Sequence, residues 1–317
     1  MTIRGVLGAA AAGLLLAGCA ALGGRDDGRI IGGAPASLGQ YPYQVEILWK
    51  VPLDGPEPKE LRQHRCGGTL VSPDPNATTT VWVVTAAHCV YSTSFAPATI
   101  APRIGIRAGF VTLADTSVPV RDVAAVIPYP GFIVPAAYRH GDKAAPIGGG
   151  NAPGADYLVD LTNDLALIRL AQPVALGANI AAIPIGVSPA VGRVIVSGWG
   201  VADQAGGGDA ARGVAAHGTS SPVLMAVPLS VIPCRPDRGR TTPPPTHFCA
   251  GEPGKDSCVG DSGGPAVLGG AEPRLVGVVS RRPFDVDTCG GRDVQTRYTK
   301  FDPLIEQWLR QTMAKGS

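Results

Sequence analysis

The chain has 317 residues, a length that allows one large domain or two smaller ones. Hydrophobic residues make up 45% of it, enough for a sizeable core, and the formal net charge is only +2. So small a charge gives no reason to expect nucleic acid or an anionic membrane surface as a partner. With 43 glycines, 30 prolines and 5% aromatic residues, the composition favours a turn-rich, all-β chain over a helical one.

The N-terminal stretch 1–19 is predicted to be an export signal. Arg4 supplies a positive charge, and the apolar run at 6–17 is too short to span a bilayer as a stable helix. The run ends in LAGC at 16–19, the order of a bacterial lipobox, in which Cys19 would be lipidated and become the mature N-terminus. The alternative is an ordinary secretory signal cleaved nearby. Both interpretations predict an exported protein, and the first makes it a cell-envelope lipoprotein.

Short apolar runs bounded by Gly, Pro and Asp predict β-strands along most of the remaining chain. The runs lie at 43–49, 81–84, 104–110, 191–196 and 275–280. Their number and shortness again favour an all-β fold.

One helix is predicted, at about 303–313. Asp302 can cap it and Pro303 suits its first position. An apolar stripe at helical spacing follows, made of Leu304, Ile305, Trp308 and Leu309.

Three segments rich in Pro, Gly or Ala are predicted to be long loops: 51–63, 138–156 and 202–220. Such loops either rim a site and shape access to it, or are plain surface excursions. Four histidines in polar stretches are expected at the surface, without a catalytic or metal-binding role: His64, His140, His217 and His247.

Three motifs carry candidate catalytic residues. His88 lies in TAAHC at 85–89, Asp164 in NDLAL at 163–167, and Ser262 in GDSGGP at 260–265. A serine hydroxyl is a poor nucleophile at neutral pH and needs an adjacent base. The base needs a third group that fixes its tautomer and stabilises the imidazolium that forms. Each residue alone could be structural, but together they predict a nucleophile, its base and the orienter of that base.

These motifs, in this order, make the chain resemble the trypsin/chymotrypsin family of serine proteases over essentially 30–313. The resemblance implies two six-stranded antiparallel β-barrels, at about 30–170 and 171–300, with the active site in the cleft between them. It also implies that the C-terminal helix packs on the second barrel. The protease domain would span 30–317.

The same resemblance implies a serine endopeptidase that works through an acyl-enzyme. His88 would be the general base, Asp164 its orienter and Ser262 the nucleophile. The backbone N–H groups of Gly260 and Ser262 would form the oxyanion hole. Substrates would be proteins or peptides, the enzyme would be a monomer, and no cofactor or metal is expected.

The cysteine count fits an exported protein. There are 7 cysteines, and lipidation of Cys19 would leave six. The resemblance implies one pairing among the possible ones: Cys66–Cys89, Cys234–Cys249 and Cys258–Cys289. Metal ligation is disfavoured because the sequence holds no Cys-x-x-Cys pair. The segment after Ile104 also lacks the acidic cluster that some family members use for calcium.

The family also suggests how the enzyme is activated. Cleavage before an Ile-Ile/Val-Gly-Gly start frees an ammonium that pairs with the aspartate preceding the nucleophile, here Asp261. Arg29 directly precedes IIGG, so 20–29 would be a propeptide cut between Arg29 and Ile30. The alternative is that Ile30 merely begins a strand. Because no cysteine lies between Cys19 and Arg29 to tether the pieces, the cut would release the domain from a lipid anchor.

Primary specificity has two interpretations. Asp256 lies where trypsin-like members place the carboxylate of the primary pocket, which predicts cleavage after Arg or Lys. Trypsin-like enzymes usually have Trp-Gly in the pocket wall after the residue matched by Ser280, but this chain has Arg281 and Arg282 there. Thr296 stands where trypsin-like enzymes keep a glycine at the back of the pocket. Thr296 would narrow the pocket and Arg282 would neutralise Asp256, which predicts small or uncharged residues instead. A noncatalytic binding module on the same fold is the remaining alternative, although such proteins usually lose a triad member.

Overall fold

The computed structural model describes residues 30–53, 59–91, 100–132, 161–201, 220–236, 245–281, 289–290 and 295–316. Several predicted features lie outside these residues: the signal with Cys19, Arg29, the segments 138–156 and 202–219, His140, His217 and Arg282. Within the described part, no helix is long and apolar enough to cross a membrane.

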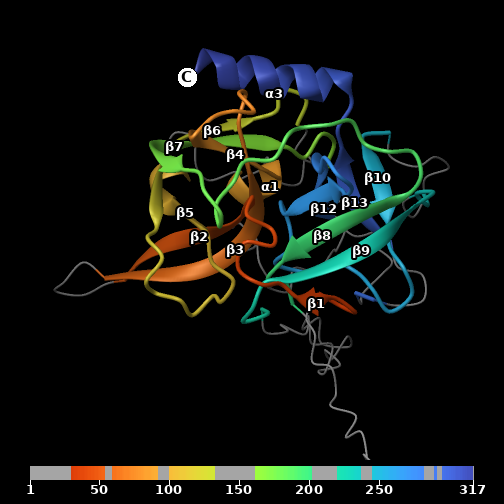
Figure 1. Ribbon diagram of the computed structural model, residues 1–317, viewed down its shortest axis with the longest axis horizontal. Coiled ribbons are helices and arrows are strands. Elements are labelled where there is room, and N and C mark those ends of the chain that lie inside the picture. The colour runs from red at the N-terminus through yellow and green to blue at the C-terminus, as the bar shows by residue number, and fades with distance from the viewer. Residues whose placement is uncertain are drawn as a thin grey trace, which may run out of the picture.

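The first half of the chain forms a closed antiparallel barrel (Figure 1). Its strands follow one another around the barrel as β2 (Gln44–Leu53), β3 (Lys59–Val71), β4 (Thr79–Thr85), β7 (Ala166–Ala175), β6 (Arg121–Pro128) and β5 (Ile104–Ala108). β-Branched and leucine side chains that point inward fill it, among them Ile47, Leu70, Val83, Ile106 and Ile168. Closure leaves no free edge within the barrel itself.

The second half forms another antiparallel barrel. Its strands run in the order β9 (Met225–Ile232), β10 (His247–Ala250), β13 (Thr296–Lys300), β12 (Arg274–Arg281), β11 (Pro265–Leu268) and β8 (Arg193–Gly198). Pairing of β8 with β9 closes the ring, and the short β1 (Ala34–Pro35) adds to β9. The expectation of two six-stranded barrels is therefore confirmed.

The predicted loop at 51–63 is mostly strand, so that prediction was wrong. The β2–β3 pairing continues past the barrel through Lys50↔Arg62 to Leu53↔Lys59. A proline is tolerated here because a two-stranded ribbon has outer edges that need no ladder partner. The extended hairpin projects to the left in Figure 1.

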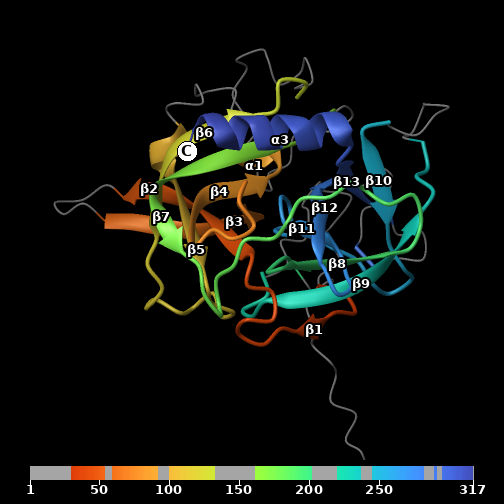
Figure 2. The same cartoon turned by 45° about the horizontal axis from the view of Figure 1, so that its top comes forward.

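The C-terminal helix α3 (Pro303–Lys315) begins as predicted. Asp302 Oδ1 accepts hydrogen bonds from the backbone N–H groups of Leu304 (3.0 Å) and Ile305 (2.9 Å), a side-chain cap. The helix runs across the top of the molecule in Figure 1, from β13 toward β6 and β7, and lies at the front in Figure 2.

The packing of α3 differs from the expectation. Its buried residues Ile305, Leu309 and Met313 belong to the same apolar cluster as the first-barrel core, and Trp308 meets Tyr129 edge to face at 5.0 Å. The helix therefore covers the first barrel rather than the second alone. Leu304, which the apolar stripe included, is exposed because the buried face is centred on Leu309.

All three disulfides pair as the resemblance implied: Cys66–Cys89, Cys234–Cys249 and Cys258–Cys289. The first ties the one-turn helix α1 (Ala87–Val90), which carries His88, to β3. The third ties the segment before Ser262 to the segment that follows β12. Two of the three bonds thus fix segments that carry predicted site residues.

Candidate active site

His88 and Asp164 are joined at two points. The His88 ring Nδ1 lies 2.6 Å from Asp164 Oδ2, and the His88 backbone N–H donates to Asp164 Oδ1 at 2.9 Å. One carboxylate therefore fixes both the backbone and the ring of His88. This arrangement places a hydrogen on Nδ1 and leaves Nε2 as the atom that can accept a proton.

Asp164 is completely buried, and two further groups hold it there. Ser280 Oγ donates to Asp164 Oδ2 at 2.7 Å, and Thr299 Oγ1 donates to the Asp164 carbonyl oxygen at 2.8 Å. Burial raises the pKa of Asp164, but His88 and the Ser280 hydroxyl lower it more, so the pKa lies below its ordinary value. The carboxylate stays ionised beside the imidazole.

Asn163 sets the direction in which Asp164 points. Its φ is +52°, a left-handed conformation that asparagine tolerates better than most residues. The Asn163 side chain donates to the Gly131 carbonyl oxygen at 3.2 Å. The turn, held by this hydrogen bond, directs the Asp164 carboxylate into the interior.

Ser262 lies on a tight turn wedged between the two barrels. Its carbonyl oxygen accepts from the Gly67 N–H of β3 at 2.8 Å, and the Gly263 N–H donates to the Val279 carbonyl oxygen of β12 at 2.7 Å. Gly263 has a φ of +74°, and a side chain there would meet Thr85 Oγ1 at 2.1 Å. The turn thus lies against the segment that leads into His88 and against the strand that carries Ser280. Ser262 itself is partly exposed.

Gly260, the other expected oxyanion donor, has a φ of +96°, a value that residues with a side chain rarely adopt. The turn around it is closed by hydrogen bonds from the Asp261 N–H to the Cys258 carbonyl (3.0 Å) and from the Gly264 N–H to the Asp261 carbonyl (2.8 Å). The backbone direction at Gly260 is therefore fixed by its neighbours.

Asp261 points inward from this turn and is completely buried. Its two oxygens accept from the backbone N–H groups of Gly200 and Cys258, both at 2.8 Å. Burial raises the pKa of Asp261 to about 6, against the two N–H groups and His64, which lower it. The carboxylate is thus costly to ionise in this environment.

Ile30, where cleavage was predicted, is also completely buried. It belongs to the second-barrel core, and its φ of +41° is a strained conformation for a β-branched residue. The next residue, Ile31, accepts from the Asp256 N–H at 3.1 Å. The segment at Ile30 and Ile31 is therefore docked beside the segment that precedes Ser262.

The predicted pocket residues Asp256 and Thr296 are in contact. Thr296 Oγ1 donates to Asp256 Oδ1 at 2.6 Å, and the two residues are 1% and 2% exposed. Ser280, also expected to line the pocket, directs its hydroxyl to Asp164. Arg281, beside the undescribed Arg282, is buried.

Two histidines are not at the surface, contrary to expectation. His247 is buried on β10, and the His64 side chain is only 8% exposed. His64 Nε2 lies 3.1 Å from the Gly260 carbonyl oxygen, so it contacts the predicted oxyanion loop. One feature of the sequence could have indicated that His64 lies near the site. It is two residues before Cys66, and the disulfide partner of Cys66, Cys89, is next to His88.

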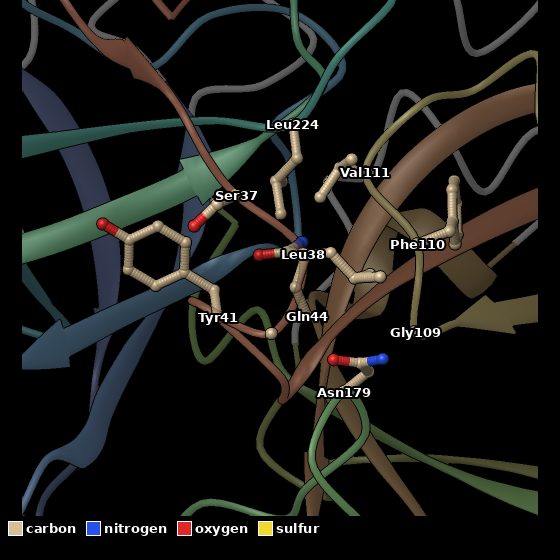
Figure 3. Close-up of a pocket in the computed structure, with 10 residues that line it drawn as sticks. Ser37, Leu38, Tyr41, Gln44, Gly109, Phe110, Val111, Asn179 and Leu224 are labelled. Atoms are coloured by element: carbon tan, nitrogen blue, oxygen red, sulfur yellow. The ribbon is translucent and has the colours of Figure 1, made fainter.

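Two other features of the described residues do not add a ligand site. The sulfurs of Cys66 and Cys89 and a ring nitrogen of His88 lie within 4.8 Å of one another, but both sulfurs are committed to a disulfide and cannot ligate a metal. A pocket shown in Figure 3 has a volume of about 10 Å³, room for at most one water molecule. Its lining includes Tyr41, Gln44, Phe110 and Leu224, none of them a predicted site residue.

The sequence is similar to those of known proteins. A family model described as Trypsin matches residues 30–308. The sequence is 28% identical to trypsin from Sus scrofa, over 91% of this chain and 97% of that protein. It is 28% identical to serine protease 1 from Homo sapiens, over 92% of each chain. It is 27% identical to the venom peptide isomerase heavy chain from Agelenopsis aperta, over 90% of this chain and 100% of that protein.

Proposed function

The chain belongs to the trypsin family of serine endopeptidases, and we propose that it is made as a precursor, activated by cleavage between Arg29 and Ile30, and cleaves after Arg or Lys. The observation that carries the catalytic part is the two-point contact between His88 and Asp164. The match to the family model also begins at Ile30, the residue that would become the new N-terminus.

In the proposed reaction, His88 Nε2 takes the proton of Ser262 Oγ as that oxygen bonds to the scissile carbonyl carbon. The N–H groups of Gly260 and Ser262 stabilise the resulting oxyanion, and each such donor typically contributes about 3 kcal/mol. The C–N bond then breaks as His88 returns the proton to the leaving amine. Water hydrolyses the acyl-enzyme by the same steps, with His88 again as base.

The surroundings of Asp261 support the activation step. Its carboxylate is completely buried and accepts from two backbone N–H groups, and burial raises its pKa to about 6, so the charged form is unfavourable there. Cleavage at Ile30 converts an amide nitrogen into an ammonium, which pairs with Asp261 and removes that cost. The Gly260–Ser262 turn is stabilised as a consequence, and the oxyanion donors with it.

We also propose that Cys19 carries the lipid anchor of the precursor and that cleavage at Arg29 frees the protease. The three disulfides fit an oxidising compartment outside the cytosol. Fractionation tests the proposal: the cut protein should leave the membrane fraction in a wash without detergent. Active, cut protein that stays with the membrane would disprove release.

A specific contact favours a second candidate for the specificity. The hydroxyl of Thr296 already satisfies one oxygen of Asp256, and its methyl group takes space that a glycine would leave open. A long cationic side chain would have to displace this contact to pair with Asp256. Cleavage after small or uncharged residues is therefore the alternative.

Hydrolysis of a peptide library that varies only the residue before the scissile bond separates the two candidates. The full chain is cut between Arg29 and Ile30 with an immobilised protease that is then removed, and Ser262→Ala is treated alike. Hydrolysis by the first protein and not by the second supports the catalytic proposal. Cleavage confined to Arg and Lys supports an open Asp256, whereas cleavage after small residues supports the second candidate.

A further inference from the structure

Behind the Gly260 loop lies a chain of buried polar contacts that the reaction above does not use. His64, on β3, bridges two elements: its Nε2 lies 3.1 Å from the Gly260 carbonyl oxygen, and its Nδ1 lies 3.1 Å from Glu46 Oε1 on β2. A carboxylate oxygen and a carbonyl oxygen can only accept. His64 Nε2 therefore donates to the Gly260 carbonyl, and the ring joins that carbonyl to Glu46 on the neighbouring strand.

Glu46 is anchored on its other side by Arg107 of β5. Arg107 Nε donates to Glu46 Oε2 at 2.6 Å, so each carboxylate oxygen has its own partner. The remaining guanidinium nitrogens donate to the carbonyl oxygens of Asp115 (2.7 Å) and Leu113 (2.9 Å). Burial raises the pKa of Glu46, but His64 and Arg107 lower it more, to below its ordinary value, so Glu46 remains a carboxylate.

An aromatic stack flanks these contacts. The Arg107 guanidinium lies over the Phe110 ring at 4.3 Å, Phe110 stacks on Trp199 at 5.0 Å, and His64 meets Trp199 edge to face at 6.2 Å. Trp199 is followed by Gly200, whose N–H binds Asp261. Phe110 is also one wall of the small pocket in Figure 3. The Gly260–Asp261 turn is thus held at its first residue by His64 and at its second by Gly200.

We propose that Glu46 is a positioning residue for the oxyanion loop: by holding His64 against the Gly260 carbonyl, it fixes the orientation of the backbone that presents the oxyanion donors. This inference rests on the proposed function, because it assigns a role within that active site. Gly260 has no side chain to restrict it and occupies a positive φ, so the contact from His64 to its carbonyl adds to the restraint that the hydrogen bonds of the turn provide. Glu46 acts only through His64 and does not touch substrate.

The test measures kcat and KM separately for the activated full chain. Donors that act in the transition state affect kcat and kcat/KM equally and leave KM alone. Glu46→Leu should lower kcat by about 10- to 100-fold, less than the loss of a whole donor, with KM changed less than about twofold. It should weaken binding of a peptidyl aldehyde, whose adduct carries an oxyanion, by a similar factor. In Glu46→Gln the amide oxygen can accept from Arg107 while the NH₂ donates to Nδ1 of a neutral His64 that still donates from Nε2, so this variant should recover most of the activity.

Two further variants keep the test decisive. Asp122→Asn removes the carboxylate that pairs with Lys50 of the same strand β2 and should leave kcat unchanged. If Glu46→Leu fails to fold because Arg107 loses its partner, His64→Phe takes its place, since that variant leaves the Glu46–Arg107 pair intact. The same loss of kcat is then expected.

A folded Glu46→Leu or His64→Phe variant with the kcat of the wild type would overturn the inference, as would a loss confined to KM. If the wild-type protein is active, neither of these results contradicts the proposed function. A wild-type chain that, once cut, neither hydrolyses peptides nor reacts with a serine-directed phosphonate would instead overturn the proposed function and this inference with it.

Discussion

Asp164 contacts the backbone N–H of His88 with one carboxylate oxygen and the imidazole ring with the other. The first contact fixes where His88 lies, and the second fixes which ring nitrogen carries hydrogen. Because the two oxygens act on one residue, a substitution can disturb the tautomer while it leaves the position unchanged.

Asp164→Asn separates these effects. The amide can still accept from the His88 backbone N–H, but its NH₂ group would face Nδ1 and favour the wrong tautomer. We expect kcat to fall by about 10⁴-fold, the size of the effect that this substitution has in the Ser-His-Asp template of the family. Activity against peptides and a thermal unfolding curve for the folded state provide the measurement. A folded variant within about tenfold of wild type would show that Asp164 does not orient the base.

Gly200→Ala tests the fit around Asp261. A Cβ at Gly200 would lie 2.3 Å from Asp261 Oδ2, closer than atoms can approach, so the Gly260–Ser262 turn must shift. We expect loss of peptide hydrolysis and a lower melting temperature. Gly177→Ala is the matched control, since a Cβ there meets nothing within 4 Å, and its stability should be unchanged or slightly higher. Equal activity in both variants would contradict the proposed role of the Asp261 contact.

The activation proposal predicts a difference in pH dependence. The pKa of Asp261 is raised to about 6 in the folded, uncut chain, so the folded state keeps a proton that the unfolded state has lost. The free energy of unfolding should therefore fall as pH rises from about 4 to about 6. After the cut, pairing with the Ile30 ammonium lowers the pKa of Asp261, and this fall should disappear.

Denaturant unfolding of Ser262→Ala, uncut and cut after Arg29, measures that difference without self-digestion. Glu46 and Asp164 have lowered pKa values, so their contributions are lost as pH falls, the opposite sign, but they are common to both forms and cancel. Parallel curves for the two forms would argue against an Ile30–Asp261 pair.

Thr296→Gly tests the specificity alternatives. Removal of the Thr296 side chain takes away one hydrogen bond to Asp256 and opens space beside it. If Thr296 closes the pocket, the variant should gain kcat/KM for Arg and Lys substrates by at least about tenfold over wild type, a change of about 1.4 kcal/mol. Thr296→Ser, which keeps the hydroxyl, should behave like wild type. An unchanged preference in the glycine variant would mean that Thr296 does not limit access.

Much of the fold could be predicted because its signals are local. The cap at Asp302 needs only the neighbouring N–H groups, and the contact between His88 and Asp164 follows from motifs whose flanks are distinctive. The disulfide pairs came from resemblance, since six cysteines alone leave many pairings open.

The features that were missed depend on partners far apart in the chain. His64 was placed at the surface because its polar neighbours suggested exposure, yet Gly260, 196 residues away, lies beside its ring. The strand character of 51–53 and 59–63 depends on a register set within the barrel, which overrides the local preference of proline for loops. The packing of α3 likewise depends on the position of the Tyr129 ring, which contacts Trp308. The sequence of the helix alone cannot predict that position.

The most direct measurement is the reaction of the cut full chain with a serine-directed peptidyl phosphonate, followed by mass spectrometry of the modified peptide. If Ser262 is a nucleophile activated by the His88–Asp164 pair, one label should attach to Ser262, hydrolysis should stop, and labelling of His88→Ala should be slower by orders of magnitude. Labelling elsewhere, or an equal rate without His88, would contradict that claim.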